Sequence, residues 1–384
     1  MSIPSLHILH TESSCGWGGQ EIRILTEAQG LIARGHQVAL ACPPQSRIHE
    51  EAGRYGVPVL DLPIARKNLT GLLAMRRLLQ TLQPEVVNTH SSTDSWLVAL
   101  ACIGLKSAPA IVRTRHISSP IPDNFASRWL YARSARHVVT TGEALRCSLM
   151  AQFGLDSGQI TSIPTGIDTN CFTPGDKGTA RKELNLAPAP SYLGIVATLR
   201  SWKGHSYLID AFASLSLPDW RLIIVGDGPQ KENLAAQVER LGLWQQVILT
   251  GQQRNPERWL QALDIFCLPS YANEGVPQAI LQAMLSGLPI VTTPVGAILE
   301  AVTHGETALV VPPKDTVALA GALSSLMHDP ELRARMGAQS RVKALSRFSL
   351  DTMLDNMELV FRNTFDRSVG ARVKIGLAGV PKRP

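Results

Sequence analysis

The chain of 384 residues has few aromatic and few charged side chains, 5% and 18% of the sequence, whereas 45% of its residues are hydrophobic. This composition can bury substantial apolar surface and excludes a disordered or fibrous protein. The six cysteines are scattered singly, without C-x-x-C spacing or the neighbouring histidines of a zinc site, and a chain of this size needs no disulfide to fold. We therefore expect a globular protein of the reduced cytosol, without a structural metal.

Long apolar runs are also missing. The longest apolar stretch near a predicted helix runs from Trp96 to Leu105. It is well short of the ~18–20 residues that a helix needs to cross a bilayer. The N-terminus lacks the charged region and long apolar core of a signal peptide. The sequence therefore predicts neither a membrane span nor a signal peptide, and it predicts a cytoplasmic location.

The excess of basic residues is confined to the end of the chain. The formal net charge is +6. Five basic residues and no acid occupy the last eighteen positions: Arg367, Arg372, Lys374, Lys382 and Arg383. Without them 32 basic residues face 31 acidic ones, so the body of the protein lacks the basic face of a nucleic-acid-binding domain. We expect no nucleic-acid partner and interpret residues 368–384 as a basic flexible tail, either idle or a tether to a surface.

Short apolar segments alternate with helical patterns in two successive halves, as in parallel sheets covered on both faces. The predicted strands are Leu6–His10, Val38–Cys42, Val57–Leu60, Glu85–Thr89, Ala110–Arg115, His137–Thr141, Tyr192–Thr198, Arg221–Val225, Val247–Thr250, Asp264–Leu268, Pro289–Thr293 and Ala308–Val311. The pattern lapses between residues 173 and 190, where proline, glycine and charge mix as in a linker. We expect an α/β protein with two Rossmann-like doubly wound domains, 1–172 and 191–348, facing a central cleft.

The loop after the predicted strand Asp264–Leu268 carries the strongest candidate for a binding site. It brings Glu274 and Gly275 to the edge of the sheet, and Val276 begins a predicted helix whose N–H groups can hold an anion. Gln282, two turns into that helix, can reach another part of an extended ligand. Alone, Glu274 is equally well interpreted as a residue that caps the helix.

Three further loops at predicted carboxyl ends of strands hold candidate residues. Arg200 and Lys203 can stabilise a diphosphate, with two solvated loop cations as the alternative. Glycines let the backbone approach a nucleotide, at Gly226 and Gly228 after one strand and at Gly18 and Gly19 after another. The latter loop is not a dinucleotide-binding G-x-G-x-x-G fingerprint, so NAD is a poor fit.

Several of these motifs, in this order, resemble the retaining glycosyltransferases of the family-4 type, which have the GT-B fold. The matching segments are Gly18–Gly19, Ile163–Asp168, Lys203–Gly204, Val225–Pro229, Asp264–Ser270 and the E-x7-E region, which is followed here by Ala283-Met-x-x-Gly-x-Pro. The resemblance implies that Glu274 holds the hydroxyls of a donor sugar and that the second acidic position, here Gln282, holds a ribose. It also implies a donor-sugar contact for His116, which follows Ala110–Arg115, and a helix at 349–367 that returns to the first domain.

The sequence departs from the family at two positions. Glutamine at position 282 retains hydrogen bonding but loses the charge-assisted strength of a carboxylate. The family's arginine lies five residues before its lysine, whereas Arg200 lies three before Lys203 and Thr198 holds the usual position.

Together these features predict a hexosyltransferase that needs neither metal nor cofactor and acts on a nucleotide diphosphate sugar. The expected acceptor is a glycan or a lipid-linked molecule of cell-surface polysaccharide or lipopolysaccharide biosynthesis. The segment Arg66–Gln83 is basic and amphipathic, which is typical of a helix that lies on an anionic membrane such as the inner membrane. The alternative is that its leucines pack beneath a sheet. A nucleotide-sugar epimerase or hydrolase and a non-enzymatic nucleotide-sugar-binding scaffold remain as alternatives.

Overall fold

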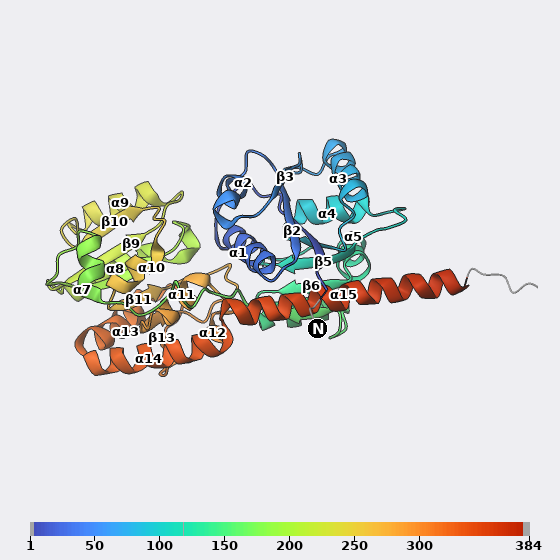
Figure 1. The fold of residues 1–384 in the computed structure, drawn as a ribbon. Coiled ribbons are helices and arrows are strands. Elements are labelled where there is room, and N and C mark those ends of the chain that lie inside the picture. The colour runs from blue at the N-terminus through green and yellow to red at the C-terminus, as the bar shows by residue number, and fades with distance from the viewer. Residues whose placement is uncertain (1–3, 118, 379–384) are drawn as a thin grey trace, which may run out of the picture. The chain divides into compact units, whose positions relative to one another are not determined.

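The computed structural model describes residues 4–117 and 119–378, which fold into two compact units (Figure 1). The first unit combines the chain up to Pro164 with the chain from Asp351 onward. The second unit is the continuous segment Thr165–Leu350.

The first unit is built on a parallel sheet of seven strands in the order β3-β2-β1-β4-β5-β6-β7. The strands are β1 (His7–Thr11), β2 (Gln37–Cys42), β3 (Val59–Asp61), β4 (Val86–Thr89), β5 (Ala110–Arg115), β6 (His137–Thr140) and β7 (Ile160–Ser162). The helices are α1 (Gly19–Ala33), α2 (Arg47–Ala52), α3 (Leu69–Leu82), α4 (Ser92–Ala101), α5 (Phe125–Trp129), α6 (Glu143–Phe153) and α15 (Leu350–Ala378), with short turns at η1 (Gly53–Tyr55) and η2 (Leu130–Ser134). Strands β1, β4 and β5 are neighbours, so the loops that follow them meet at one edge.

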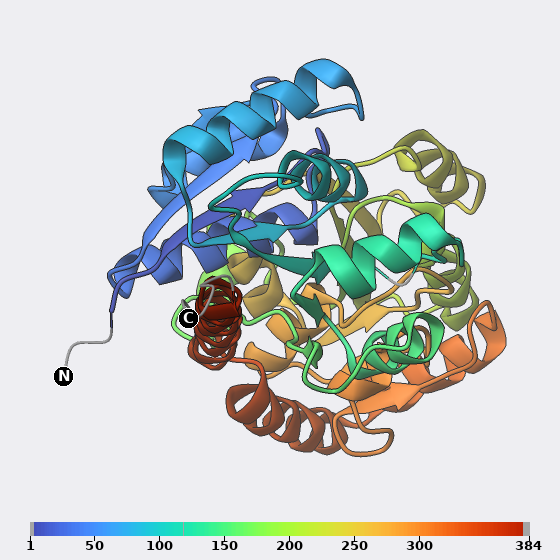
Figure 2. The same ribbon diagram turned by 90° about the vertical axis from the view of Figure 1, so that its right-hand side faces the viewer.

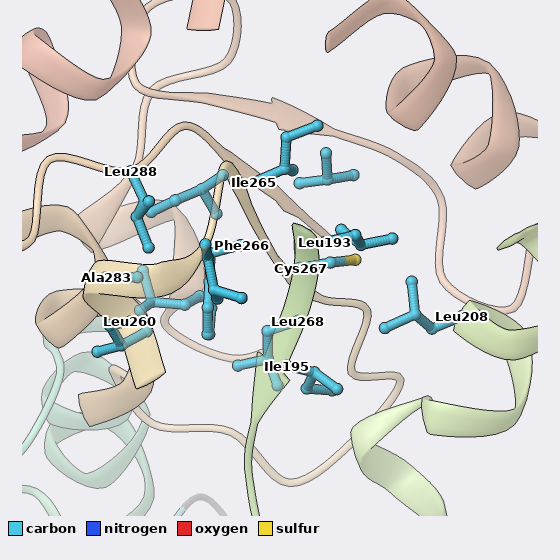
Figure 3. Close-up of a cluster of buried hydrophobic side chains, with 14 of the residues drawn as sticks. Leu193, Ile195, Leu208, Leu260, Ile265, Phe266, Cys267, Leu268, Ala283 and Leu288 are labelled. Carbon is cyan, nitrogen blue, oxygen red and sulfur yellow. The ribbon is translucent and has the colours of Figure 1, made fainter. Parts of the chain in front are cut away.

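The second unit has a parallel sheet of six strands in the order β10-β9-β8-β11-β12-β13. The strands are β8 (Ser191–Val196), β9 (Trp220–Val225), β10 (Val247–Gly251), β11 (Ile265–Leu268), β12 (Ile290–Thr292) and β13 (Ala308–Val310). The helices are α7 (Lys177–Glu183), η3 (Ser201–Lys203), α8 (His205–Leu215), α9 (Lys231–Arg240), α10 (Pro256–Ala262), α11 (Gln278–Leu285), α12 (Ile298–Ala301), α13 (Thr316–His328) and α14 (Pro330–Arg347). Figure 3 shows β11 side chains such as Phe266 between Leu208 of α8 and Ala283 of α11. This two-sided cover explains the continuous apolar strands.

Two parallel sheets flanked by helices confirm the predicted α/β fold. The predicted strands agree with the observed ones to within two residues at either end, and β7 is the one strand of the described chain that the sequence did not predict. The chain divides at Pro164 and Thr165 rather than at residues 172 and 173. The segment 173–190, predicted as a linker, carries α7 and is anchored to the second unit, since Arg181 pairs with Asp264 at 2.7 Å.

Helix α15 returns the chain to the first unit, as predicted (Figures 1 and 2). Its Asp355 pairs with Arg34 at 2.7 Å, and its Arg362 donates to the Pro4 carbonyl at 2.8 Å. The predicted end of the helix at residue 367 is wrong, because α15 continues to Ala378. Gly370 and Gly376 each lower helix propensity by about 1 kcal/mol, but the residues between them are mostly compatible with a helix. The rest of the predicted tail, 379–384, lies outside the described residues.

Helix α3 contains most of the basic amphipathic segment found in the sequence. Met75 and Leu79 are buried in the core, whereas Leu69 and Leu73 are 68% and 49% exposed. Most apolar side chains of α3 thus pack against the sheet, whereas those of Leu69 and Leu73 are exposed to solvent. Within the described ranges, no helix has both the length and the apolar character needed to cross a membrane.

The contact between α1 and α15 is testable at Gly30. A Cβ atom at this position would overlap the side chain of Leu354. We predict that Gly30→Ala lowers the free energy of unfolding by about 1–3 kcal/mol through overpacking. Adding Leu354→Ala should make the double variant more stable than the two separate losses predict, as measured by urea unfolding.

Gly321 provides the matched control, because it lies inside helix α13 with open space around its Cβ position. Gly321→Ala should raise the free energy of unfolding by about 0.5–1 kcal/mol through helix propensity alone. Equal effects of the two alanines would show that α15 does not press on α1 at this point.

Candidate functional site

In the second unit, the loops after β8 and β11 bring Lys203 and Glu274 together. The Lys203 ammonium donates to Oε1 of Glu274 at 2.7 Å, and the Ser270 hydroxyl donates to the same oxygen at 2.6 Å. The Glu274 side chain is 5% exposed and that of Lys203 is 18% exposed. Two residues that the sequence analysis assigned to different parts of a ligand therefore form one charged pair at the carboxyl edge of the sheet.

Glycines allow the loops of this edge to pack against each other. Gly296, after β12, has φ +60°, and a Cβ atom there would overlap the carbonyl oxygen of Glu274. Gly226, after β9, has φ +146°, and a Cβ atom would overlap the Ala197 carbonyl. Gly228 lies against the backbone of Leu199 in the same way. Gly226 and Gly228, which the sequence predicts to let the backbone approach a nucleotide, thus lie against the loop after β8.

The backbone between Glu274 and α11 presents unused donors. The N–H groups of Gly275 and Val276 donate to no described residue. Helix α11 begins at Gln278, two residues later than predicted, so these amides precede its first turn. Gln282 is half-buried on α11, and its side chain makes no hydrogen bond to the described residues. Unpaired amides at a helix start are suited to an anion.

Arg200 is not drawn into the pair formed by Lys203 and Glu274. Its exposed guanidinium lies 5.7 Å from the centroid of the Trp202 ring, a cation–π arrangement. The two predicted cations thus differ in their surroundings, since Lys203 is half-buried and ion-paired.

In the first unit, three histidines form a hydrogen-bonded chain. Nδ1 of His10 lies 2.9 Å from Nε2 of His90, and Nδ1 of His90 lies 2.9 Å from Nε2 of His116. His10 lies in β1, and the other two directly follow β4 and β5, the next strands of the sheet. His116 is 9% exposed and forms the outer end of the chain.

All three rings are held neutral. Burial lowers the pKa of His10 to about 3, and it also lowers the pKa values of His90 and His116. The positive charges of Arg23 and Arg113 lower the last two further. A neutral imidazole donates through one nitrogen and accepts through the other, so the chain couples the proton position of His116 to that of His10.

A polar network beside the histidines anchors the loop that carries Gly18 and Gly19. Glu12 accepts hydrogen bonds from the Ser14 amide at 2.7 Å and from the side chains of Ser91 and Gln20. Asp94 accepts from the His90 amide at 2.9 Å and closes a capping box with Ser91 at the start of α4. Burial raises the pKa of both carboxyls, and Asp94 adds to the rise at Glu12.

Sequence reasoning missed His10, Glu12 and Asp94. The Ser91-x-x-Asp94 spacing is a capping-box signature that could have indicated the start of α4. The position of His10 and Glu12 at the carboxyl end of β1 could have indicated that they lie near His90.

Comparison with known families covers most of the chain. Residues 17–170 match Glycosyltransferase Family 4, and residues 176–343 match Glycosyl transferases group 1. The chain belongs to glycosyltransferase family 4. The family predicted from the motifs is thereby confirmed.

Several curated glycosyltransferases are similar in sequence to this chain. A lipopolysaccharide core biosynthesis mannosyltransferase of Rhizobium meliloti is 34% identical over 201 residues, 50% of this chain and 57% of that protein. A D-inositol 3-phosphate glycosyltransferase of Corynebacterium glutamicum is 28% identical over 364 residues, 87% of this chain and 85% of that protein. The chain spans about half the length of several curated relatives that it matches.

Solved glycosyltransferases share the fold. One from Rickettsia africae superimposes with a TM-score of 0.84 at 19% identity, covering 94% of this chain and 99% of that one. Anabaena HepE in complex with UDP-glucose gives a TM-score of 0.82 at 23% identity, covering 93% of this chain and 100% of that one. Both are GT-B glycosyltransferases, so the GT-B prediction is confirmed.

The Lys203–Glu274 pair should be strongly coupled. We predict that Lys203→Met lowers the free energy of unfolding by up to about 3–5 kcal/mol, because it leaves the buried Glu274 charge without its partner. Glu274→Gln should lower the free energy of unfolding by less than Lys203→Met does, because the Lys203 charge that it leaves unpaired is more exposed to water than the Glu274 charge. The double variant should be more stable than the sum of the single losses predicts, as measured in a urea double-mutant cycle.

The control cycle uses Arg258 and Glu183, whose ion pair at 3.2 Å is 44% and 47% exposed. Its coupling should be no more than about 1 kcal/mol. Equal coupling in the two cycles would contradict a special role of burial at Glu274.

The histidine chain should make the protein labile to acid. The unfolded chain takes up a proton at His10 near pH 6.5, whereas the folded pKa is about 3. Between these values the unfolded state binds more protons, so stability is present above pH 6.5 and is lost as the pH falls toward 3. Urea titrations should show that the free energy of unfolding falls as the pH is lowered from 6.5 toward 3. His10→Gln should reduce this slope by up to about 1.4 kcal/mol per pH unit.

His328 of α13 is the control, because its exposed ring meets water in both states. His328→Gln is measured beside His10→Gln as the reference for the substitution itself. If His10→Gln gave the same slope of stability against pH as this reference, a neutral buried His10 would be ruled out.

Proposed function

We propose that this protein is a retaining hexosyltransferase that uses a nucleotide diphosphate sugar. The observation that carries the proposal is the Lys203–Glu274 pair beside the amides of Gly275 and Val276, which donate to no described residue. The chain matches the family over most of its length. Anabaena HepE, which shares the fold, binds UDP-glucose. This similarity supports a nucleotide-sugar donor here.

In the proposed reaction, the bond between the anomeric carbon and the diphosphate breaks while the acceptor oxygen bonds to that carbon. The leaving diphosphate takes the proton of the acceptor hydroxyl. Lys203 and the Gly275 and Val276 amides stabilise the charge that grows on the diphosphate, and Arg200 contributes from the exposed end of its loop. The fixed cations and amides do the work that a metal does in other transferases, so we propose that no metal or other cofactor is needed.

Glu274 and His116 are proposed to orient the donor sugar. Oε1 of Glu274 is engaged by Lys203 and Ser270, which reduces its reactivity as a nucleophile and favours hydrogen bonding to sugar hydroxyls. Neutral His116 offers a directed hydrogen bond rather than a charge. Half-buried Gln282 is proposed to hold the ribose. We assign the Gly18–Gly19 loop to the donor phosphates and to the acceptor side of the site.

The pathway and location are proposals that rest on similarity. The Rhizobium meliloti mannosyltransferase belongs to lipopolysaccharide core biosynthesis, which supports a glycan or lipid-linked acceptor in surface-polysaccharide or lipopolysaccharide assembly. We propose a cytoplasmic enzyme with peripheral contact to the anionic inner membrane through exposed Leu69 and Leu73. Leu69→Ser with Leu73→Ser should then weaken flotation with anionic liposomes.

The proposal is tested by incubating the protein with labelled UDP- and GDP-hexoses, with and without membrane extract. We predict that label enters a product only when acceptor is present, that the anomeric configuration of the donor is retained, and that chelator leaves the rate largely unchanged. Release of free sugar or an epimer without acceptor would favour a hydrolase or epimerase. No turnover with any donor would favour a scaffold.

Variants in the second unit sharpen this test. Glu274→Gln should lower kcat about 10²–10³-fold with a smaller effect on KM, because its contacts strengthen as charge develops. Lys203→Met should lower the rate of transfer more than Arg200→Gln does, because Lys203 is half-buried whereas Arg200 is exposed to water. Unchanged kinetics of Glu274→Gln in a folded protein would remove this residue from the site.

A further inference from the structure

The two ends of the histidine chain differ in what they can bind. Nε2 of His10 is buried without a hydrogen-bond partner, and the ring of Phe361 lies against His10 with the ring centroids 6.4 Å apart. Nδ1 of His116, at the other end, makes no hydrogen bond to a described residue. Exposure rises from 0% at His10 through 3% at His90 to 9% at His116, so a ligand can reach the chain only from its outer end.

The two contacts between the rings allow only two arrangements of their protons. Burial lowers the pKa of all three rings, so each ring is neutral and carries one N–H. Each contact between nitrogens needs one N–H that faces one lone pair. Any arrangement in which the rings do not all point the same way places two protons or two lone pairs face to face.

In the outward arrangement, His10 and His90 both donate through Nδ1, and the proton of His116 lies on Nδ1 at the outer end. In the inward arrangement, His116 and His90 both donate through Nε2, and the proton of His10 lies on its buried Nε2. The tautomer of His116 is therefore tied to that of His10, two rings away.

The buried end of the chain favours the outward arrangement. The inward arrangement leaves the Nε2–H of His10 without an acceptor, whereas the outward one leaves only a lone pair there. Buried N–H groups without a partner are rarer in folded proteins than acceptors with an unused lone pair. We therefore expect the proton of His116 on Nδ1.

The backbone that carries each ring is fixed. His10 lies within β1, between β2 and β4 of the sheet. The His90 amide donates to Asp94 at 2.9 Å, and the hydroxyl of Thr141 donates to the His116 carbonyl at 3.2 Å. These contacts hold the rings in line although two of them follow the ends of their strands.

We propose that His10 and His90 are positioning residues that keep Nδ1 of His116 a hydrogen-bond donor toward a ligand oxygen. That this oxygen is a hydroxyl of the donor sugar rests on the proposed function, whereas the tautomer of His116 does not. A hydroxyl has one proton and two lone pairs. When it accepts from His116, it keeps its proton for a second partner, and in the inward arrangement it would have to give that proton to His116.

The first test determines which nitrogen of His116 carries the proton in the free protein. Proton–nitrogen NMR correlation spectra of protein with isotope-labelled histidine distinguish the two tautomers at neutral pH, and His116→Gln identifies the signals of this ring. We expect a protonated Nδ1. His36 is the reference for the other tautomer, because its Nδ1 accepts from the Leu6 amide at 3.0 Å. A proton on Nε2 of His116 would overturn the proposal.

The second test reverses the chain from its buried end. His10→Met and His10→Leu both place an apolar side chain in the core, but only the methionine sulfur can accept a hydrogen bond. It should accept from Nε2–H of His90 and so move the His116 proton to Nε2, whereas His10→Leu should leave that proton on Nδ1. A residue with a merely structural role would not change the tautomer of a ring that it does not touch.

His137→Leu is the matched control, because it removes a buried histidine of β6, in the same sheet but outside the chain. It should leave the His116 tautomer unchanged. If His10→Met also left it unchanged, the coupling between the rings would be refuted. If the His10 variants do not fold, the spectrum of the wild type still decides which arrangement is present.

The third test connects the tautomer to transfer. With the donor found active in the labelling experiment, kcat/KM of His10→Met should lie about threefold to tenfold below that of His10→Leu, the loss of one directed hydrogen bond. Equal values, with the tautomer reversed, would overturn the role in sugar binding. Absence of transfer by the wild type would instead overturn the proposed function and leave the NMR result standing.

Discussion

Every strand pair in both sheets is parallel, so after each strand the chain must cross a face of the sheet before the next strand begins. These crossings cover both faces with helices, and the loops that lead from strands into helices meet at the carboxyl edge. Polar and charged residues gather there because the faces are apolar. The Lys203–Glu274 pair, the glycine contacts and the histidine chain all follow from this constraint.

Both units bury opposite charges. In the second unit, a lysine and a serine converge on a single carboxylate oxygen of Glu274. In the first unit, Arg23 lies 3.6 Å from Glu27, and both side chains are fully buried. The first unit also holds Glu12 and Asp94 with donors from the backbone and from uncharged side chains, beside three histidines kept neutral by burial. A neutral network forms directional hydrogen bonds, whereas a charged pair creates a strong local field, so the first unit combines the two kinds of interaction.

The sequence predicts the fold well because most strands are short, nearly continuous apolar runs separated by helical patterns. Strand β7 was missed because it has three residues, two of them Thr161 and Ser162, and offers no apolar run. The candidate residues were found individually, but their partners were not. Lys203 and Glu274 are 71 residues apart, and His10 and His90 are 80 apart. Only the order of strands in the sheet makes them neighbours, and local patterns do not encode that order.

The first unit is assembled from two pieces of chain separated by the whole of the second. On a ribosome adding about 5–20 residues per second, roughly 10–40 s pass between the emergence of Pro164 and that of Asp351. During this interval the surface of α1 around Gly30 and the Arg23 guanidinium lack their contacts with Leu354 and Met357. The second unit, being continuous, can complete its core before the first is closed. Biosynthesis therefore leaves the surface of α1 that Leu354 and Met357 later cover exposed on the nascent chain, for a period long enough for chaperones to bind it.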